Sequence, residues 1–301
     1  MTATTSLYPP ESHALRDLPF EMGAISEDRS RAWVDLDRGL APDGVVSVGA
    51  LATVADVLAG SLCARAVAPD WMATSALSLH LGDLPTSGCL VVDAQIARLG
   101  RTTLVIQISF APGDATGATD AAPGPAVGDG VASFSRLPRR DTNLDITDHQ
   151  RAPEQRVSMA LPGSGLNQPF EDAIGGVVVD AAAGVTLTPV VPYVQNSFGA
   201  VNGGIVGALA DVSARATVDA RCERTSRTVA LSVQYLRQMR AGQVRTDSQI
   251  IRSAGCGATV RVELRDAAVE GADGSINGAD PRSWSDLMAV AHVTLELGAN
   301  R

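Results

Sequence analysis

Residues 46–56 read VSVGALATVAD, and residues 201–211 read VNGGIVGALAD. Each stretch is an apolar, small-residue helix pattern that contains one carboxylate, Asp56 or Asp211. A carboxylate in such a helix is costly to bury unless it has a partner or a task. The repetition predicts two copies of one structural unit, which can face each other as the two subunits of a dimer do.

The similarity between the two halves extends beyond these stretches. We expect central helices over residues 48–67 and 204–220 and matching strands after them, because apolar and β-branched residues alternate there. The expected strands are 32–36, 74–81, 90–99, 103–110 and 131–135 in the first half and 177–180, 228–235, 244–252, 259–264 and 288–297 in the second. Such alternation is typical of antiparallel sheets with one covered face.

The predicted fold class is therefore α+β. It consists of two domains, each an antiparallel β-sheet wrapped around a long central α-helix, since this arrangement hides an apolar helix in a short chain. We place the first domain at residues 1–137 and the second at 166–301. Residues 138–165 are polar and proline-containing, and we interpret them as a linker.

Composition excludes several classes of function. The net charge is −9 and no basic run occurs, which argues against nucleic acid as a partner. All 24 basic residues are arginine, so neither a Schiff-base lysine nor a lysine-containing phosphate loop is available. The four cysteines are widely spaced and the four histidines complete no metal signature, so we expect free thiols and no metal.

The compartment follows from the same features. Free thiols are typical of a reducing environment, and the N-terminal residues lack the pattern of a secretory signal, which predicts a cytoplasmic protein. Residues 45–64 are nearly long and apolar enough to span a bilayer. Asp56 lies in their centre, which favours a buried core helix, and we expect no membrane partner.

The second copy carries the more complete motif. Residues 196–204 read NSFGAVNGG, and Asp211 follows in the predicted helix. This order resembles the hotdog fold, in particular the PaaI-like acyl-CoA thioesterases, here as a tandem double hotdog. That family usually shows an Asn, then His-Gly-Gly six residues later, then an acidic residue in the helix. The residues that fit are Asn196, Gly203, Gly204 and Asp211, and Asn202 stands in place of the histidine.

The resemblance implies an active site at the interface between the two units. One unit gives Asn196 and the main-chain amide of Gly203, and the other gives Asp56 and Thr74. Asp56 then acts as general base on water or attacks the thioester directly, and the sequence leaves both roles open. The Gly203 amide at the helix start meets the developing oxyanion. Asn202 can still donate a hydrogen bond.

The reciprocal site is expected to be degenerate. It pairs Asp211 and Thr228 with Ala41 and Val48, which stand where the family has Asn and Gly. The residue one helical turn after each aspartate also differs. Arg215 follows Asp211 at a spacing that allows an ion pair, whereas Gly60 follows Asp56.

The implied substrate is a coenzyme A thioester, and no further cofactor is expected. Its phosphates require arginine in this chain. The candidate coenzyme A-binding residues are Arg98, Arg101, Arg237, Arg252 and Gly204, with Arg240 beside them. Double hotdogs often pair through sheet edges, so a homodimer is plausible.

Two alternatives stay open at this point. The chain could be a non-catalytic module that binds an acyl-CoA or acyl ligand, in which Asp56 is only structural. A hotdog hydratase is disfavoured, because it needs a histidine near an aspartate in the helix region and neither predicted helix contains histidine.

Overall fold

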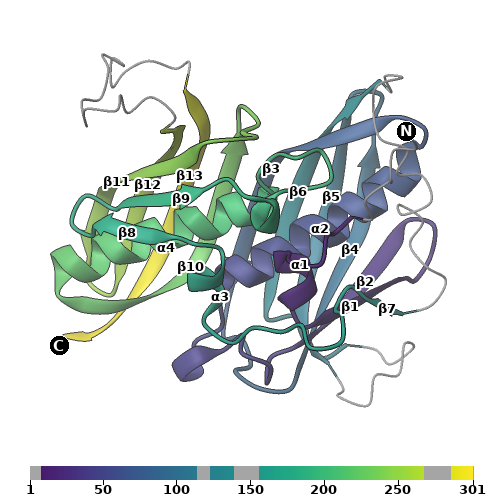
Figure 1. Ribbon diagram of the computed structural model, residues 1–301. Helices are drawn as coiled ribbons and strands as arrows, with labels where there is room; N and C mark the ends of the chain where they lie inside the picture. The colour runs from purple at the N-terminus through teal and green to yellow at the C-terminus, as the bar shows by residue number, and fades with distance from the viewer. Residues whose placement is uncertain (1–7, 114–122, 139–155, 268–285, 301) are drawn as a thin grey trace.

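The computed structural model describes residues 8–113, 123–138, 156–267 and 286–300. Its strands form one 13-stranded sheet in the order β7-β1-β2-β4-β5-β6-β3-β10-β13-β12-β11-β9-β8, and every pairing is antiparallel. Two long helices, α2 and α4, lie against this sheet, one in each half (Figure 1).

The elements of the first half are α1 (Ala14–Asp17), β1 (Phe20–Ala24), β2 (Arg29–Asp35), the 3-10 turn η1 (Pro42–Gly44), α2 (Val48–Val67), β3 (Trp71–Leu81), β4 (Cys89–Leu99), β5 (Thr103–Gly113), β6 (Gly128–Leu137) and β7 (Val157–Ser158). Those of the second half are α3 (Phe170–Ala173), β8 (Val177–Asp180), β9 (Val185–Pro189), the 3-10 turn η2 (Pro192–Val194), α4 (Gly203–Cys222), β10 (Arg224–Tyr235), β11 (Gln243–Ala254), β12 (Gly257–Asp266) and β13 (Leu287–Asn300).

The two halves join where β3 pairs with β10. At the centre of this pairing Ser78 lies opposite Ser232, and their hydroxyl oxygens are 2.9 Å apart. These two serines occupy equivalent positions of the repeat, so the pairing of β3 with β10 is symmetric about this pair.

The two central helices begin at capping residues. The hydroxyl of Ser47 accepts a hydrogen bond from the amide of Ala50 at 3.0 Å, and the Asn202 side chain accepts one from Gly204 at 2.9 Å. Such caps satisfy amides that have no partner within the helix. Helix α2 coincides with the predicted range 48–67, and α4 extends the predicted 204–220 by one residue at its start and two at its end.

Small residues let the two helices approach closely. A Cβ atom added to Gly49 would lie 2.6 Å from the Cβ of Ala208, and one added to Gly204 would lie 2.2 Å from the Cα of Thr53. The N-terminal parts of α2 and α4 therefore pack with their backbones nearly in contact. The interhelical contact is the basis of the site described below, because it brings Asp56 to the start of α4.

The expected strands are all present, most with longer bounds, but three others were not predicted. Strand β1 pairs with β2, β9 pairs with β8 and β11, and β7 pairs with β1. These strands are short, and none has an alternating pattern long enough to be recognised in the sequence. Strand β7 falls in the expected linker, of which residues 139–155 lie outside the described residues. The domain boundaries themselves stay a prediction.

Within the described residues one helix, Val48–Val67, is long and apolar enough to cross a bilayer. In the structure 78% of its most apolar window is buried inside the protein. The helix packs on α4 and on the first half of the sheet.

Candidate functional site

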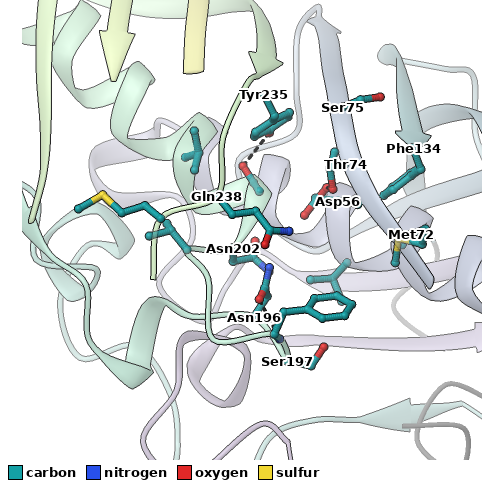
Figure 2. Close-up of a pocket in the computed structure, with 18 of the residues that line it drawn as sticks. Asp56, Met72, Thr74, Ser75, Phe134, Asn196, Ser197, Asn202, Tyr235 and Gln238 are labelled. Carbon is teal, nitrogen blue, oxygen red and sulfur yellow. Dashed lines mark hydrogen bonds between the residues drawn. The ribbon is translucent and has the colours of Figure 1, made fainter. Parts of the chain in front are cut away.

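A cavity of about 370 Å³ lies where the two halves meet, and residues of both halves line it. Helix α2 and strand β3 contribute from the first half, and the segment leading into α4 and the end of β10 contribute from the second. Figure 2 shows the labelled polar side chains that gather in this cavity: Asp56, Thr74, Ser75, Asn196, Ser197, Asn202, Tyr235 and Gln238. Asp56 and Thr74 of the first copy therefore meet Asn196 and Asn202 of the second copy in one cavity.

Asp56 is the ionisable group at the centre of the site. Its Oδ1 accepts a hydrogen bond from the Thr74 hydroxyl at 2.9 Å, and its Oδ2 accepts one from the Gly204 amide at 3.3 Å. Burial raises the pKa of Asp56 to about 6, although the two hydrogen bonds act in the opposite direction. The carboxylate is thus ionised at neutral pH and still basic enough to accept a proton.

A β-bulge directs Thr74 toward Asp56. In the pairing of β3 with β6, Thr74 lies opposite Phe134 and Ala76 opposite Ser133, so Ser75 is an extra residue in β3. The leucines at 77 and 79 are fully buried, and simple alternation would put Thr74 on the other face of the sheet. The extra residue reverses this parity and turns the hydroxyl inward.

The N-terminus of α4 supplies main-chain donors to the same site. The Gly204 amide is shared between Asp56 and the capping oxygen of Asn202. Gly203 is the first helical residue, so its amide has no acceptor within the helix. A Cβ added to Gly203 would lie 2.8 Å from Oδ2 of Asp56, so a side chain at this position would displace the carboxylate. Gly204 is needed mainly for the approach to α2.

Asn196 lies on the cavity wall, but its side-chain oxygen is already used. This oxygen accepts hydrogen bonds from the amides of Phe198 and Ala200, at 3.0 and 3.1 Å, and so holds the turn before α4. The side-chain NH₂ group is the part of Asn196 that remains for a ligand. The ring of Phe198 packs against Trp71 of the first half, with ring centroids 4.4 Å apart.

The equivalent residues of the second half form an ion-pair network. Asp211 is buried and accepts a hydrogen bond from Thr228, which a matching bulge in β10 turns inward. Arg215 lies 3.1 Å from Asp211 and 3.7 Å from Glu171. Glu171 also accepts a hydrogen bond from Ser47, the cap of α2, at 2.6 Å. The sequence reading of Asp211 as an ion-paired residue matches this geometry.

The candidate coenzyme A-binding residues do not gather in one place. Arg237 is part of the cavity wall, and Arg240 lines an adjoining surface depression. Arg98, Arg101 and Arg252 are not among the residues that line either one. Their role in binding coenzyme A stays a prediction.

Sequence reasoning missed two tyrosines at the site. The hydroxyl of Tyr235 donates a hydrogen bond to the Gly203 carbonyl at 2.7 Å, as the dashed line in Figure 2 marks. Burial and then the charge of Asp56 raise the pKa values of Tyr235 and of Tyr8, which also lines the cavity. Tyr235 occupies the position that Leu81 has in the first repeat, and this difference between the copies could have identified Tyr235 from the sequence. Tyr8 precedes both repeats, so no comparison of the halves could identify it.

Comparison with known proteins adds independent information. A family model described as the acyl-CoA thioesterase N-terminal domain matches residues 192–276, which include the start of α4 and strand β10. No curated protein matches the sequence.

The chain is also similar to solved structures. One is an acyl-ACP thioesterase from Bacteroides thetaiotaomicron, with a TM-score of 0.55 and 12% identity over 90% of this chain and 100% of that one. A second is the tesB protein of Mycobacterium avium subs paratuberculosis, with a TM-score of 0.53 and 11% identity over 92% and 96% of the two chains. A third is a 12:0-ACP thioesterase from Umbellularia californica, with a TM-score of 0.52 and 11% identity over 90% and 94%.

At such identities the structural likeness concerns the fold, which is of the hotdog type found in thioesterases. The family-model match adds a relationship in sequence over the segment that carries Asn196, Asn202 and the two glycines. Together the two findings support a thioester hydrolase.

Proposed function

We propose that this chain is an acyl-CoA thioesterase of the PaaI-like type, built as a tandem double hotdog with one complete site between its two units. The observation that carries the proposal is the contact of Asp56 with Gly204. A buried carboxylate of one half accepts a hydrogen bond from the helix N-terminus of the other half, beside a cavity. This juxtaposition gives a base and main-chain donors within one site.

The proposed reaction cleaves the C–S bond of the thioester. Either the Asp56 carboxylate takes a proton from a water molecule that attacks the carbonyl carbon, or it attacks that carbon itself and water hydrolyses the resulting anhydride. Both routes end with a carboxylic acid and the free thiol of coenzyme A. Thr74 holds Oδ1 of Asp56 at 2.9 Å and the Gly204 amide holds Oδ2 at 3.3 Å, so the carboxylate is oriented through both of its oxygens.

The oxyanion is proposed to form at the start of α4. The Gly203 amide is the donor there without an intrahelical acceptor, and the helix N-terminus favours negative charge. Tyr235 supports this position, because its hydroxyl binds the Gly203 carbonyl at 2.7 Å and so holds the peptide between Gly203 and Gly204, which follows the Gly203 amide. Asn202 replaces the family's histidine. Its oxygen caps α4, so only its NH₂ group can hydrogen-bond a thioester carbonyl.

The remaining features of the proposal concern binding. Arg237 is the arginine of the predicted set that lies on the cavity wall, and we assign the phosphate-bearing end of coenzyme A to its side of the cavity. The proposed setting is the cytoplasm, with two chains paired as a homodimer and without membrane attachment.

The test measures thiol release from acyl-CoA thioesters ranging from acetyl to palmitoyl, with phenylacetyl-CoA included. Asp56→Asn is compared with Asp211→Asn, its counterpart in the repeat. We expect turnover by the wild type, a loss of about 100-fold or more in kcat/KM for Asp56→Asn, and near-normal kcat/KM for Asp211→Asn when that variant is folded. Loss only in Asp211→Asn would contradict the assignment of the site.

A non-catalytic acyl-ligand module is the competing function, and the presence of Asn202 in place of the family's histidine favours it. The same experiment separates the two. A folded wild type that binds an acyl-CoA thioether but releases no thiol from any substrate is a binding module.

A further inference from the structure

The residue one helical turn after the central aspartate differs between the two halves, and the two residues have different surroundings. On α4 the guanidinium of Arg215 lies beside Asp211 and reaches Glu171, while its own side chain is 32% exposed. On α2 the equivalent residue is Gly60, which lines the cavity next to Asp56. The same helical spacing therefore places an arginine side chain in one half and a cavity-lining glycine in the other.

The two side chains nearest to a Cβ at Gly60 are apolar. A Cβ atom added to Gly60 would lie 3.4 Å from Cε of Met72 and 3.8 Å from Cε1 of Phe134, and both side chains line the cavity. Val57 and Ala64 of α2 line it on either side of Gly60 along the helix. The walls of this part of the cavity can thus bind a hydrocarbon group.

The polar part of the cavity lies on the other side of Asp56. In Figure 2 Met72 and Phe134 lie on one side of the carboxylate, and Gln238 and Tyr235 lie on the other. Arg237 lies between the exposed Leu236 and Gln238 in the chain, and it lines the cavity on this polar side. A thioester with its carbonyl at Asp56 would then direct its acyl group toward Gly60 and its thiol group toward Arg237.

We propose that the residue one turn after the aspartate decides whether each site is open: Gly60 keeps a compartment for an apolar acyl chain, and Arg215 fills the equivalent compartment in the second half. The inference rests on the proposed function for the identity of the ligand. It assigns Gly60 as the specificity-determining residue for the acyl group, and it assigns Arg215 as the reason, beyond the missing motif residues, that the chain has one site rather than two.

Binding of non-hydrolysable thioethers tests this assignment without requiring turnover. The probes are S-methyl-CoA and S-decyl-CoA, and the measured quantity is the ratio of their dissociation constants by calorimetry. The variants are Gly60→Ala and Gly60→Leu. The control is Ala66→Leu, which adds comparable bulk on the same helix at a residue that does not line the cavity. Circular dichroism verifies that each variant is folded.

In the wild type we expect S-decyl-CoA to bind more tightly than S-methyl-CoA, because a buried methylene contributes about 0.8 kcal/mol, or roughly fourfold in affinity. Gly60→Leu should reduce this preference by about tenfold or more, since a pocket discriminates by that factor against groups it cannot hold. Gly60→Ala should reduce it by a smaller factor, and Ala66→Leu should leave it unchanged. Affinity for S-methyl-CoA should change little in any variant.

A preference for the decyl chain that survives in folded Gly60→Leu overturns the inference, as does a wild type that binds both thioethers equally. If Gly60→Leu does not fold, the smaller change in Gly60→Ala decides the question. Failure of the proposed function has a different signature. Wild type would then release no thiol from acyl-CoA substrates, while the chain-length preference in binding still depends on residue 60.

The variant Gly60→Arg gives a second, independent readout. It recreates on α2 the Asp-to-Arg spacing that is ion-paired on α4. We expect it to abolish the decyl preference and to stop thiol release together. Retention of both in the folded variant would contradict the role given to Arg215.

Discussion

Asp56 in the first half of the chain accepts a hydrogen bond at 3.3 Å from the main-chain amide of Gly204 in the second half. The carboxylate is therefore oriented by a residue 148 positions away along the chain, and its geometry depends on how closely α2 and α4 pack. Main-chain donors at a helix start favour the ionised form, but burial outweighs them and raises the pKa of Asp56 to about 6.

The first prediction concerns the pH dependence of turnover. A carboxylate that acts as base or nucleophile must be deprotonated, so kcat/KM for acyl-CoA hydrolysis should fall below a midpoint near pH 6 and be level above it. In Thr74→Val this midpoint should move to higher pH, because the lost hydrogen bond lowers the pKa of Asp56 in the wild type. The measurement is kcat/KM from pH 4.5 to 8. A midpoint that does not move would argue against Asp56 as the titrating group.

The second prediction concerns the pH dependence of stability. The pKa of Asp56 is about 6 in the folded chain and about 3.9 in an unfolded one, so the folded state binds more protons between these values. The stability that Asp56 contributes through this difference is fully present below the unfolded pKa, and it is lost as the pH rises through about 6. Relative to Asp56→Asn, the wild type should lose about 2 kcal/mol between pH 4 and pH 7.

Urea denaturation of both proteins at several pH values measures this difference. The comparison cancels the contributions of groups that the substitution does not affect. A difference between the proteins that is constant with pH would mean that Asp56 titrates at its ordinary value.

The fold could be predicted from the sequence because its main signals are local. Helix α2 was placed correctly from a continuous apolar pattern, and the longer strands were placed from alternation. The same reasoning failed for β1, β7 and β9, which are held by their neighbours in the sheet rather than by a pattern of their own.

The site was harder to predict, for two physical reasons. Simple alternation along β3 predicts that the Thr74 side chain lies on the sheet face that points away from Asp56. The bulge at Ser75 turns the Thr74 hydroxyl toward Asp56 instead. Its selection from the sequence came from the family resemblance. Contacts across long sequence distances are also invisible locally: the hydroxyl of Tyr8 donates to the Gln195 carbonyl at 3.3 Å, 187 residues away, and thereby brings the N-terminal segment to the cavity.

The third prediction compares two glycines of the central helices. Gly204→Ala should destabilise the chain by about 3 kcal/mol or more, because the new Cβ would lie 2.2 Å from the backbone of Thr53 and the helices would have to separate. Gly60→Ala meets only ordinary contacts, at 3.4 Å or more, and should be neutral or stabilising by up to about 1 kcal/mol. Urea denaturation of both variants gives the two values. Equal effects would contradict the close helix packing.

The fourth prediction concerns the ion pair of the second half. Arg215→Met should lower the free energy of unfolding by about 3 kcal/mol at pH 7, because it leaves the buried carboxylate of Asp211 without its cation at 3.1 Å. Asp211→Asn combined with Arg215→Met should recover part of this loss, since no buried charge then remains. A double-mutant cycle by urea denaturation measures the coupling between the two residues.

Thiol release by the same variants serves as the control, because Asp211 and Arg215 lie outside the cavity wall that contains Asp56. We expect kcat/KM to stay within about twofold of the wild type in every variant that is folded. A coupling energy below about 0.5 kcal/mol would place the pair with ordinary exposed salt bridges. In that case the charge of Arg215 would not be what closes the second site, and the volume of its side chain would remain as the cause.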